Sequence, residues 1–320
     1  MTSTSSKLKP DWAGDDLLSR FVNLLIQTKP LYQVMKYQAR QVLIKTAEKN
    51  GVAWRQYCED FERSEVKTLF PELENPNVTY PDYYQVPFHA YDSGNLSWQA
   101  AFEAIPATYA MCLRVWKDEP ISWETAHQRL RNSFLEVLAS YSPNKVTDML
   151  DIGCSVGIST LALHRYYQQR QTEPIKTLGL DLSPYMLSVA KISDTEGEIS
   201  EWVHGLAEET SFGDNSFDVV TLQLTLHELP REATQAIFQE ALRILRPGGV
   251  IGIVDNNPLS PVIQGLPPVL FVLMKSTEPW SDDYYTFDVE NCLTSVGFIH
   301  ETTVPSDPRH RTIIARKPLS

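Results

Sequence analysis

Cysteine is scarce in this sequence and widely scattered. Only four cysteines occur in 320 residues, namely Cys58, Cys112, Cys154 and Cys292. No two of them form a CxxC pair, and none lies in a cysteine and histidine cluster. This spacing argues against a zinc framework and gives no basis for a disulfide framework. We therefore expect no metal site and a reducing compartment.

Long apolar and basic runs are also missing. The longest apolar run, residues 266–274, contains two prolines and is about half as long as a membrane-spanning helix requires. The first residues contain no apolar signal core. No run of lysine and arginine exceeds two residues, and the formal net charge of −12 repels polyanions. The sequence thus predicts a cytoplasmic protein without a membrane span or a nucleic-acid partner.

The N-terminal part of the chain has helical periodicity and no sheet pattern. Apolar residues recur at spacings of three and four residues over residues 14–70 and again over residues 98–116. Pro30 is expected to separate two helices within the first of these ranges. Residues 71–98 contain four prolines and four tyrosines, which predicts an ordered loop. Ser122 is a plausible N-cap for a further helix. We expect residues 1–120 to form a helical cap and residues 121–320 a second domain.

From residue 145 the pattern changes to alternating strands and helices. Strands are predicted at residues 146–153, 177–183, 201–205, 217–226 and 250–255, with helices between them. A last helix over 287–296 precedes two more strands, the final one over 310–315. This alternation predicts an α/β fold with a parallel sheet covered on both faces.

Ligands of such sheets bind at the carboxyl ends of the strands. The first strand ends in the run Asp151-Ile-Gly-Cys-Ser-Val-Gly157, and the second ends at Asp181. Glycines let a ligand approach the backbone, and an acid at the second strand can accept both hydroxyls of a ribose. The GxGxxG dinucleotide pattern fails at Ser155 and Ile158, and no phosphate-binding GxxxxGK[ST] occurs. An NAD-dependent oxidoreductase is therefore a disfavoured alternative.

The motif LDIGCSVG resembles motif I of the class I S-adenosylmethionine-dependent methyltransferases. LGLDLSPYMLSVAK, GLAE at 205–208 and ILRPGGVIGIVD are similar to later motifs of the family, so that residues 146–255 match in order. The resemblance implies a Rossmann-like seven-stranded sheet, mostly parallel with an antiparallel last strand, and S-adenosyl-L-methionine as cofactor. Residues 83–98 and 276–288 are similar to methyltransferase-like proteins of photosynthetic organisms.

The same resemblance implies a set of cofactor-binding residues. Ser155 stands where the family usually has a glycine, and Leu206 where a subset has an aspartate. The implied contacts to the methionine part, the ribose and the adenine are Asp151, Gly153, Ser155, Gly157, Asp181, Leu182, Ala207 and Glu208.

The acceptor side carries weaker signals. His227 is the candidate general base, with Glu228 beside it. Tyr84, His89, Asp255 and Asn256 are candidate acceptor contacts. We expect a small, hydrophobic or aromatic acceptor under the helical cap. A protein or RNA methyltransferase and a cofactor-binding regulatory protein without turnover stay open as alternatives, as do the acceptor atom and the oligomeric state.

Overall fold

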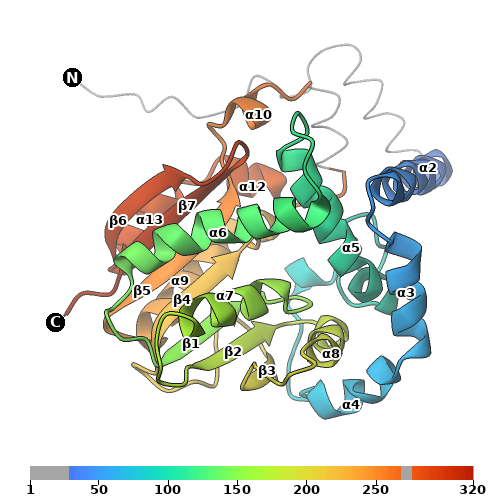
Figure 1. Cartoon of the computed structure of the whole chain (residues 1–320). Helices are drawn as coiled ribbons and strands as arrows, with labels where there is room; N and C mark the ends of the chain where they lie inside the picture. The colour runs from blue at the N-terminus through green and yellow to red at the C-terminus, as the bar shows by residue number, and fades with distance from the viewer. Residues whose placement is uncertain (1–28, 268–275, 320) are drawn as a thin grey trace.

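A seven-stranded sheet forms the centre of the protein. The structure is a computed structural model that describes residues 29–267 and 276–319 (Figure 1). The strand order is β3-β2-β1-β4-β5-β7-β6. Strands β1 to β5 run parallel, and β7 is antiparallel to β5 and β6. The predicted Rossmann-like sheet is therefore confirmed. The strand bounds are Asp148–Ile152 (β1), Lys176–Asp181 (β2), Glu201–His204 (β3), Phe217–Gln223 (β4), Leu245–Asn256 (β5), Ile299–Pro305 (β6) and His310–Arg316 (β7).

Helices precede the sheet and alternate with its strands. Before β1 lie α2 (Lys29–Lys49), α3 (Trp54–Arg63), η1 (Glu65–Thr68), α4 (Phe70–Leu73), η2 (Asp82–Tyr84), α5 (Trp98–Val115) and α6 (Trp123–Tyr141). After it come α7 (Ile158–Gln168), α8 (Pro184–Ser193), η3 (Leu226–Glu228), α9 (Arg231–Ile244), α10 (Pro261–Gln264), α12 (Ser281–Tyr285) and α13 (Val289–Val296). Ser122 caps α6 as predicted, because its hydroxyl accepts the Thr125 N–H. The helical residues expected over 14–28 lie outside the described residues.

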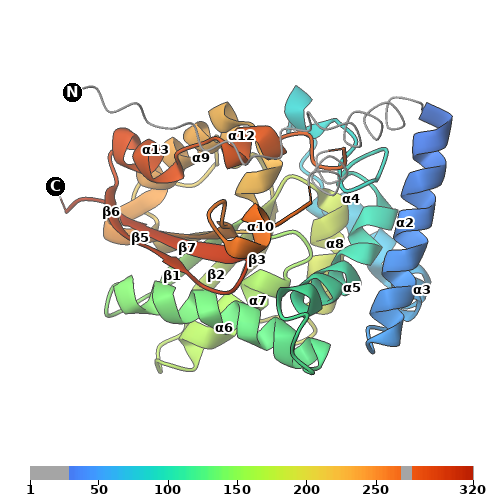
Figure 2. The ribbon, with the colours of Figure 1, turned by 90° about the horizontal axis from the view of Figure 1, so that it is seen from above.

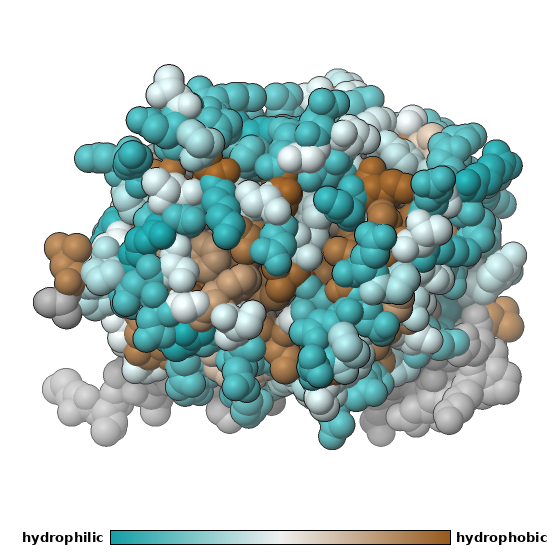
Figure 3. Space-filling model, turned by 90° about the horizontal axis from the view of Figure 1, so that it is seen from below, coloured by the Kyte–Doolittle hydropathy of each residue, from teal (hydrophilic) through white to brown (hydrophobic). Residues whose placement is uncertain are grey.

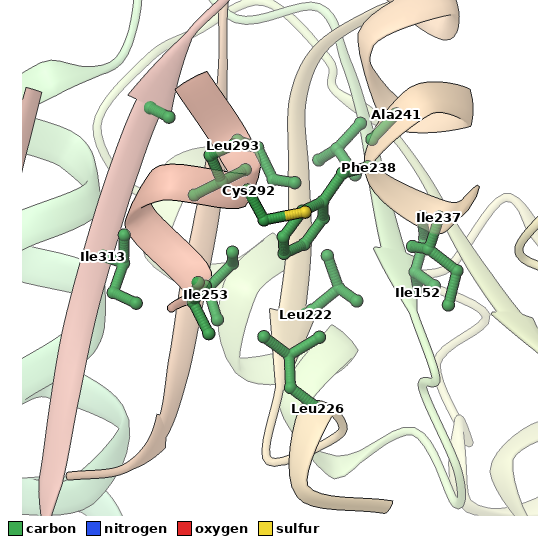
Figure 4. Close-up of a cluster of buried hydrophobic side chains, with 14 of the residues drawn as sticks. Ile152, Leu222, Leu226, Ile237, Phe238, Ala241, Ile253, Cys292, Leu293 and Ile313 are labelled. Atoms are coloured by element: carbon green, nitrogen blue, oxygen red, sulfur yellow. The ribbon is translucent and has the colours of Figure 1, made fainter. Parts of the chain in front are cut away.

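Two apolar layers hold the helices on the sheet. Helices α9 and α13 cover one face, and α6 and α7 cover the other (Figure 2). Along β1, Leu150 and Ile152 face the first layer and Met149 faces the second, because strand side chains alternate. In the first layer, Phe238 of α9 is completely buried near Leu222 of β4 (Figure 4). Burying side chains of this size stabilises the fold by about 1.5–3 kcal/mol each.

Strand β4 is shorter than the sequence predicts. The apolar run extends to Leu226, but the strand ends at Gln223 and residues 226–228 form η3. Leu224 adopts a φ of +59°, which turns the chain out of the sheet. Leu226 then points back into the core and is buried. His227 and Glu228 therefore lie on a turn beyond the carboxyl end of β4.

The helices that precede α6 pack on one another and on α8. Helix α5 contacts α2, α3, α6 and α8, and Phe102 of α5 shares an apolar cluster with Met186 and Val189 of α8. Glu103 of α5 is almost fully buried and forms an ion pair with Arg40 of α2. The division near residue 120 stays a prediction, since α5 packs on both sides of it.

The described surface is mostly hydrophilic on the face seen from below, where hydrophobic side chains gather near the centre (Figure 3). Val34, Tyr37 and Val42 on α2 are exposed as well. Among the described residues, no helix has the length and apolar character that crossing a membrane requires.

Candidate active site

A cavity of about 1130 Å³ lies at the carboxyl ends of β1, β2, β4 and β5. Its wall combines the loops after these strands with residues of α2, α5 and the segments 83–95 and 276–280. A pocket for one drug-sized ligand measures roughly 300–1,000 Å³. The cavity therefore has room for two small molecules side by side.

The turn after β1 adopts left-handed backbone conformations. The φ angles are +69° at Gly153, +49° at Ser155 and +78° at Gly157. A Cβ atom at Gly157 would stand 2.5 Å from the Trp202 ring, and one at Gly153 would stand 2.7 Å from Thr225 Cγ2. Both positions therefore require glycine. Ser155 replaces the family's usual glycine in a conformation that costs a side-chain-bearing residue about 1–2 kcal/mol.

Asp181 joins this turn to the end of β2. One carboxylate oxygen accepts the Ser155 N–H and the other accepts the Ser183 N–H, each at 2.8 Å. The Asp181 side chain lines the cavity, and each oxygen keeps a lone pair for a further donor. Burial raises the pKa of Asp181 to about 6.

Asp151 is placed differently from Asp181. It is 1% exposed and is not among the residues that line the cavity. Its carboxylate bonds secure the start of α7 and the end of β4, so the geometry suits holding the loop in shape. The donors to this carboxylate are Ser159, Thr160, Thr221 and Gln223.

The loops after β2 and β3 form another part of the wall. Leu182, Ala207 and Glu208, which the sequence resemblance implies as cofactor contacts, line the cavity. The Tyr83 hydroxyl donates to Glu208 Oε1 at 2.6 Å. Burial and the Glu208 charge raise the pKa of Tyr83, so its hydroxyl stays protonated. This bond ties the aromatic segment around Tyr83 to the loop after β3.

His227 and Asp255 form a hydrogen-bonded pair at the other end of the cavity. His227 Nδ1 lies 2.8 Å from Asp255 Oδ1, and the His227 backbone N–H donates to Asp255 Oδ2. Burial acts to lower the pKa of His227, but the charge of Asp255 outweighs it and raises the pKa to about 9. The other ring nitrogen, Nε2, has no hydrogen-bond partner among the described residues.

Further predicted residues meet His227 there. Glu228 Oε1 lies 3.7 Å from His89 Nε2, and Glu228 Oε2 accepts a bond from Asn95 Nδ2 at 3.3 Å. Burial raises the pKa of Glu228 to about 8. Tyr84, His89 and Asn256 also line the cavity, so residues from the N-terminal part and the sheet share one site.

Sequence reasoning assigned no role to several lining residues, among them Arg131, Glu278 and Trp280. Arg131 of α6 is 7% exposed and forms no ion pair with a described residue, although it bonds His127 and Gln223. The helical spacing of apolar residues could have identified Arg131, because it lies on the buried face of α6 near Phe134. Glu278 and Trp280 lie in the segment 276–288, outside the cofactor motifs of residues 146–255.

Known proteins resemble parts of this chain. Residues 150–253 match the family model described as a methyltransferase domain. A methyltransferase of Synechocystis sp. is 31% identical over 172 residues, covering 53% of this chain and 74% of the relative. A demethylmenaquinone methyltransferase of Bacillus licheniformis is 29% identical over 153 residues, covering 48% of this chain and 61% of the relative. A solved S-adenosylmethionine-dependent methyltransferase from Aquifex aeolicus aligns with a TM-score of 0.46 at 18% identity, over 64% of this chain and 98% of that one.

The family match includes parts of the chain that line the cavity. The matched family region runs from the end of β1 through β5 and so contains the glycine turn, Asp181 and the turn with His227. The Synechocystis relative extends the likeness over about three quarters of its own length. The chain belongs to the class I S-adenosylmethionine-dependent methyltransferases, enzymes whose cofactor is S-adenosyl-L-methionine.

Proposed function

We propose that this enzyme methylates a small, largely hydrophobic or aromatic acceptor. The observation that carries the proposal is the cavity, whose acceptor end is walled by Tyr84, Phe88 and Trp280. Apolar walls with a few polar groups are typical of small-molecule sites. The relative named as a demethylmenaquinone methyltransferase, which acts on a quinone by its name, supports this acceptor class.

The residues of the cavity fit the cofactor. The Asp181 carboxylate has lone pairs left for two ribose hydroxyls, and Leu182, Ala207 and Glu208 offer a surface for the adenine. Gly153 and Ser155 present backbone beneath the methionine part, while Asp151 and Gly157 hold the turn from behind. The Arg131 guanidinium is suited to the cofactor's carboxylate.

Methyl transfer requires little of the protein beyond alignment. When bound, the cofactor supplies a methyl group already activated by its sulfonium. Holding the acceptor in line with that group contributes roughly 7–11 kcal/mol. We assign this work to the walls of the acceptor end, with Asn256 and His89 as further acceptor contacts.

His227 and Glu228 are proposed as the catalytic residues. Asp255 orients the imidazole, so that Nε2 is left for the acceptor's reacting atom. Glu228 lies beside it on the same turn and is held by Asn95. Together they hold the reacting end of the acceptor, and each accepts its proton only where it is itself deprotonated, above about pH 8 for Glu228 and about pH 9 for His227.

Methyl transfer from radiolabelled cofactor to a panel of small phenols and quinols tests the acceptor class, with total RNA and total protein as competing acceptors. We expect label in small molecules. Label confined to RNA or protein would contradict the proposal, and binding of S-adenosylhomocysteine without any labelled acceptor would favour a regulatory protein.

The catalytic assignment is tested by His227→Ala, once an acceptor is found. We expect a lower kcat and a Kd for S-adenosylhomocysteine within about twofold of wild type, in line with a role confined to the transition state. His300→Ala is the matched control, because His300 is exposed on β6 and does not line the cavity.

A further inference from the structure

We propose that His89, His227 and Glu278 form a divalent-cation site of the zinc type at the acceptor end of the cavity. The inference rests on the proposed function and deepens it, since the cation would meet the acceptor's reacting oxygen. One ligand atom of each residue lies within 4.8 Å of the other two. Around a tetrahedral zinc ion, ligand atoms are about 3.4 Å apart, so movements of about 1 Å complete the set.

His227 has the environment of a metal-binding histidine. Its Nδ1 bonds the Asp255 carboxylate at 2.8 Å, and Asp255 is 2% exposed. A carboxylate on one ring nitrogen is the usual partner of a histidine whose other nitrogen binds a metal. Asp255 also accepts the backbone N–H groups of His227 and Asn256, which fixes its own orientation. Nε2 of His227 is therefore presented from a rigid support.

His89 is held in place by an unusual backbone. His89 and the following Ala90 both have positive φ angles, +48° and +68°. A positive φ angle is energetically unfavourable for residues other than glycine, and backbone strain of this kind is concentrated at functional sites. The His89 N–H donates to the carbonyl of Thr277 at 2.8 Å, and this bond brings the residue after Thr277, Glu278, alongside His89.

Glu278 has one carboxylate oxygen engaged and one left for a ligand. The Ser281 hydroxyl lies 3.3 Å from Glu278 Oε2, at the start of α12. No hydrogen bond from a described residue reaches Oε1. The Ser281 hydroxyl donates chiefly to the Glu278 backbone carbonyl at 2.9 Å, so it holds the Glu278 main chain firmly and the carboxylate only weakly, and the carboxylate can turn toward the shared centre.

The charge around this centre favours a cation. Asp255, Glu228 and Glu278 surround the two imidazoles, and Asp255 is deeply buried. None of the three carboxylates forms an ion pair with a lysine or arginine of the described residues. Several carboxylates gathered in a half-buried site repel one another unless a positive charge lies between them. The His227 imidazole, when protonated, supplies one positive charge beside Asp255, and a divalent ion that displaces this proton supplies two.

Two imidazoles and one carboxylate select the kind of metal. Imidazole suits zinc, iron and nickel, whereas magnesium prefers oxygen ligands throughout. Three protein ligands leave a fourth position open toward the cavity, as in catalytic zinc sites. An acceptor hydroxyl bound there would be polarised by the ion and would lose its proton to solvent, and its oxygen would then take the cofactor's methyl group as the methyl–sulfur bond breaks.

Titration of the full-length, chelator-treated protein with Zn²⁺ by calorimetry tests the site. We expect one equivalent to bind, without competition from Mg²⁺. His89→Ala and Glu278→Gln should each weaken zinc binding at least about tenfold. Asp255→Asn, which alters the support of His227 without removing a ligand, should weaken it about 10- to 100-fold. His300→Ala is the control and should bind zinc as wild type does.

S-adenosylhomocysteine titration of each variant shows that it is folded, because none of these residues is assigned to the cofactor. If Glu278→Gln does not fold, Glu278→Asp replaces it, since a carboxylate shortened by one methylene should also weaken zinc. Wild type that binds S-adenosylhomocysteine but no zinc, or variants that bind zinc unchanged, would overturn the cation site alone. The proposed function fails separately if the radiolabelled cofactor labels no small acceptor even at saturating zinc.

Discussion

The Asp181 carboxylate accepts the backbone N–H of Ser155 at 2.8 Å, although the two residues are 26 positions apart in the chain. The bond joins the end of β2 to the glycine turn after β1. The acid that we assign to the ribose and the turn that we assign to the methionine part therefore form one unit. A change on either side is expected to disturb both.

We expect Asp181→Ala to raise the Kd for S-adenosylhomocysteine about ten- to a hundredfold. Losing hydrogen bonds to a charged acceptor costs about 1.5–3 kcal/mol. Calorimetric titration measures the effect. Glu201→Ala is the matched control, because Glu201 is an exposed acid at the far end of β3. Equal affinities of Asp181→Ala and wild type would remove the ribose assignment.

Gly157→Ala is expected to destabilise the protein more than Gly197→Ala. Both glycines have a positive φ, but a Cβ atom at Gly157 meets Trp202 at 2.5 Å, whereas one at Gly197 meets nothing within 4 Å. The conformation costs about 1–2 kcal/mol in both cases, and overpacking adds about 1–3 kcal/mol at Gly157. Thermal unfolding compares the two, and similar Tm values would show that the turn after β1 is not packed against Trp202 in this way.

Cofactor affinity should fall in acid. Asp181 must be ionised to accept two hydroxyls, and its pKa is raised to about 6 by burial, with Asp151, Cys154 and Tyr84 facing it. Affinity for S-adenosylhomocysteine is then full well above pH 6 and declines below it, by about tenfold between pH 8 and pH 5. Asp181→Asn does not titrate, so its affinity should change far less over this range. A wild-type profile as flat as that of the variant would argue against the assignment.

The ionisation of Asp181 has the opposite effect on folding stability, which it lowers as the pH rises. The folded-state pKa of Asp181 lies above the usual aspartate value of 3.8, so the folded protein binds this proton more tightly than the unfolded chain does. The contribution of Asp181 to stability is therefore greatest at low pH and is lost as the pH rises through about 6. Relative to wild type, Asp181→Asn should gain stability between pH 4 and pH 7, as denaturant unfolding at both values would show.

Tyr83→Phe should loosen the aromatic segment from the loop after β3. The change removes the hydrogen bond to Glu208 and should lower the free energy of unfolding by about 1.5–3 kcal/mol. Tyr141→Phe is the control, because the Tyr141 hydroxyl has no hydrogen bond to a described residue. If both variants unfold at the same denaturant concentration, the Tyr83 bond does not anchor the segment.

Much of the fold was predictable because its signals are local. Alternation of apolar residues and the turn residues between them predicted every strand of the sheet. The end of β4 was missed because the apolar run continues to Leu226, and only the positive φ of Leu224 turns that residue into the core. The spacing of apolar residues does not reveal where a strand ends, because an apolar residue just after the strand can be buried in the core as well as one within it.

The amino-acid sequence by itself determined the α/β order, the glycine turn and the acid at the end of β2, because each depends on residues close together in the chain. Only the tertiary structure determined which residues meet at the acceptor end of the cavity. His89, His227 and Glu278 come from three segments, and a backbone bond to Thr277 together with the pairing of His227 and Asp255 brings them to one point. Which distant segments meet depends on how the helices pack on the sheet, and no local pattern carries that information.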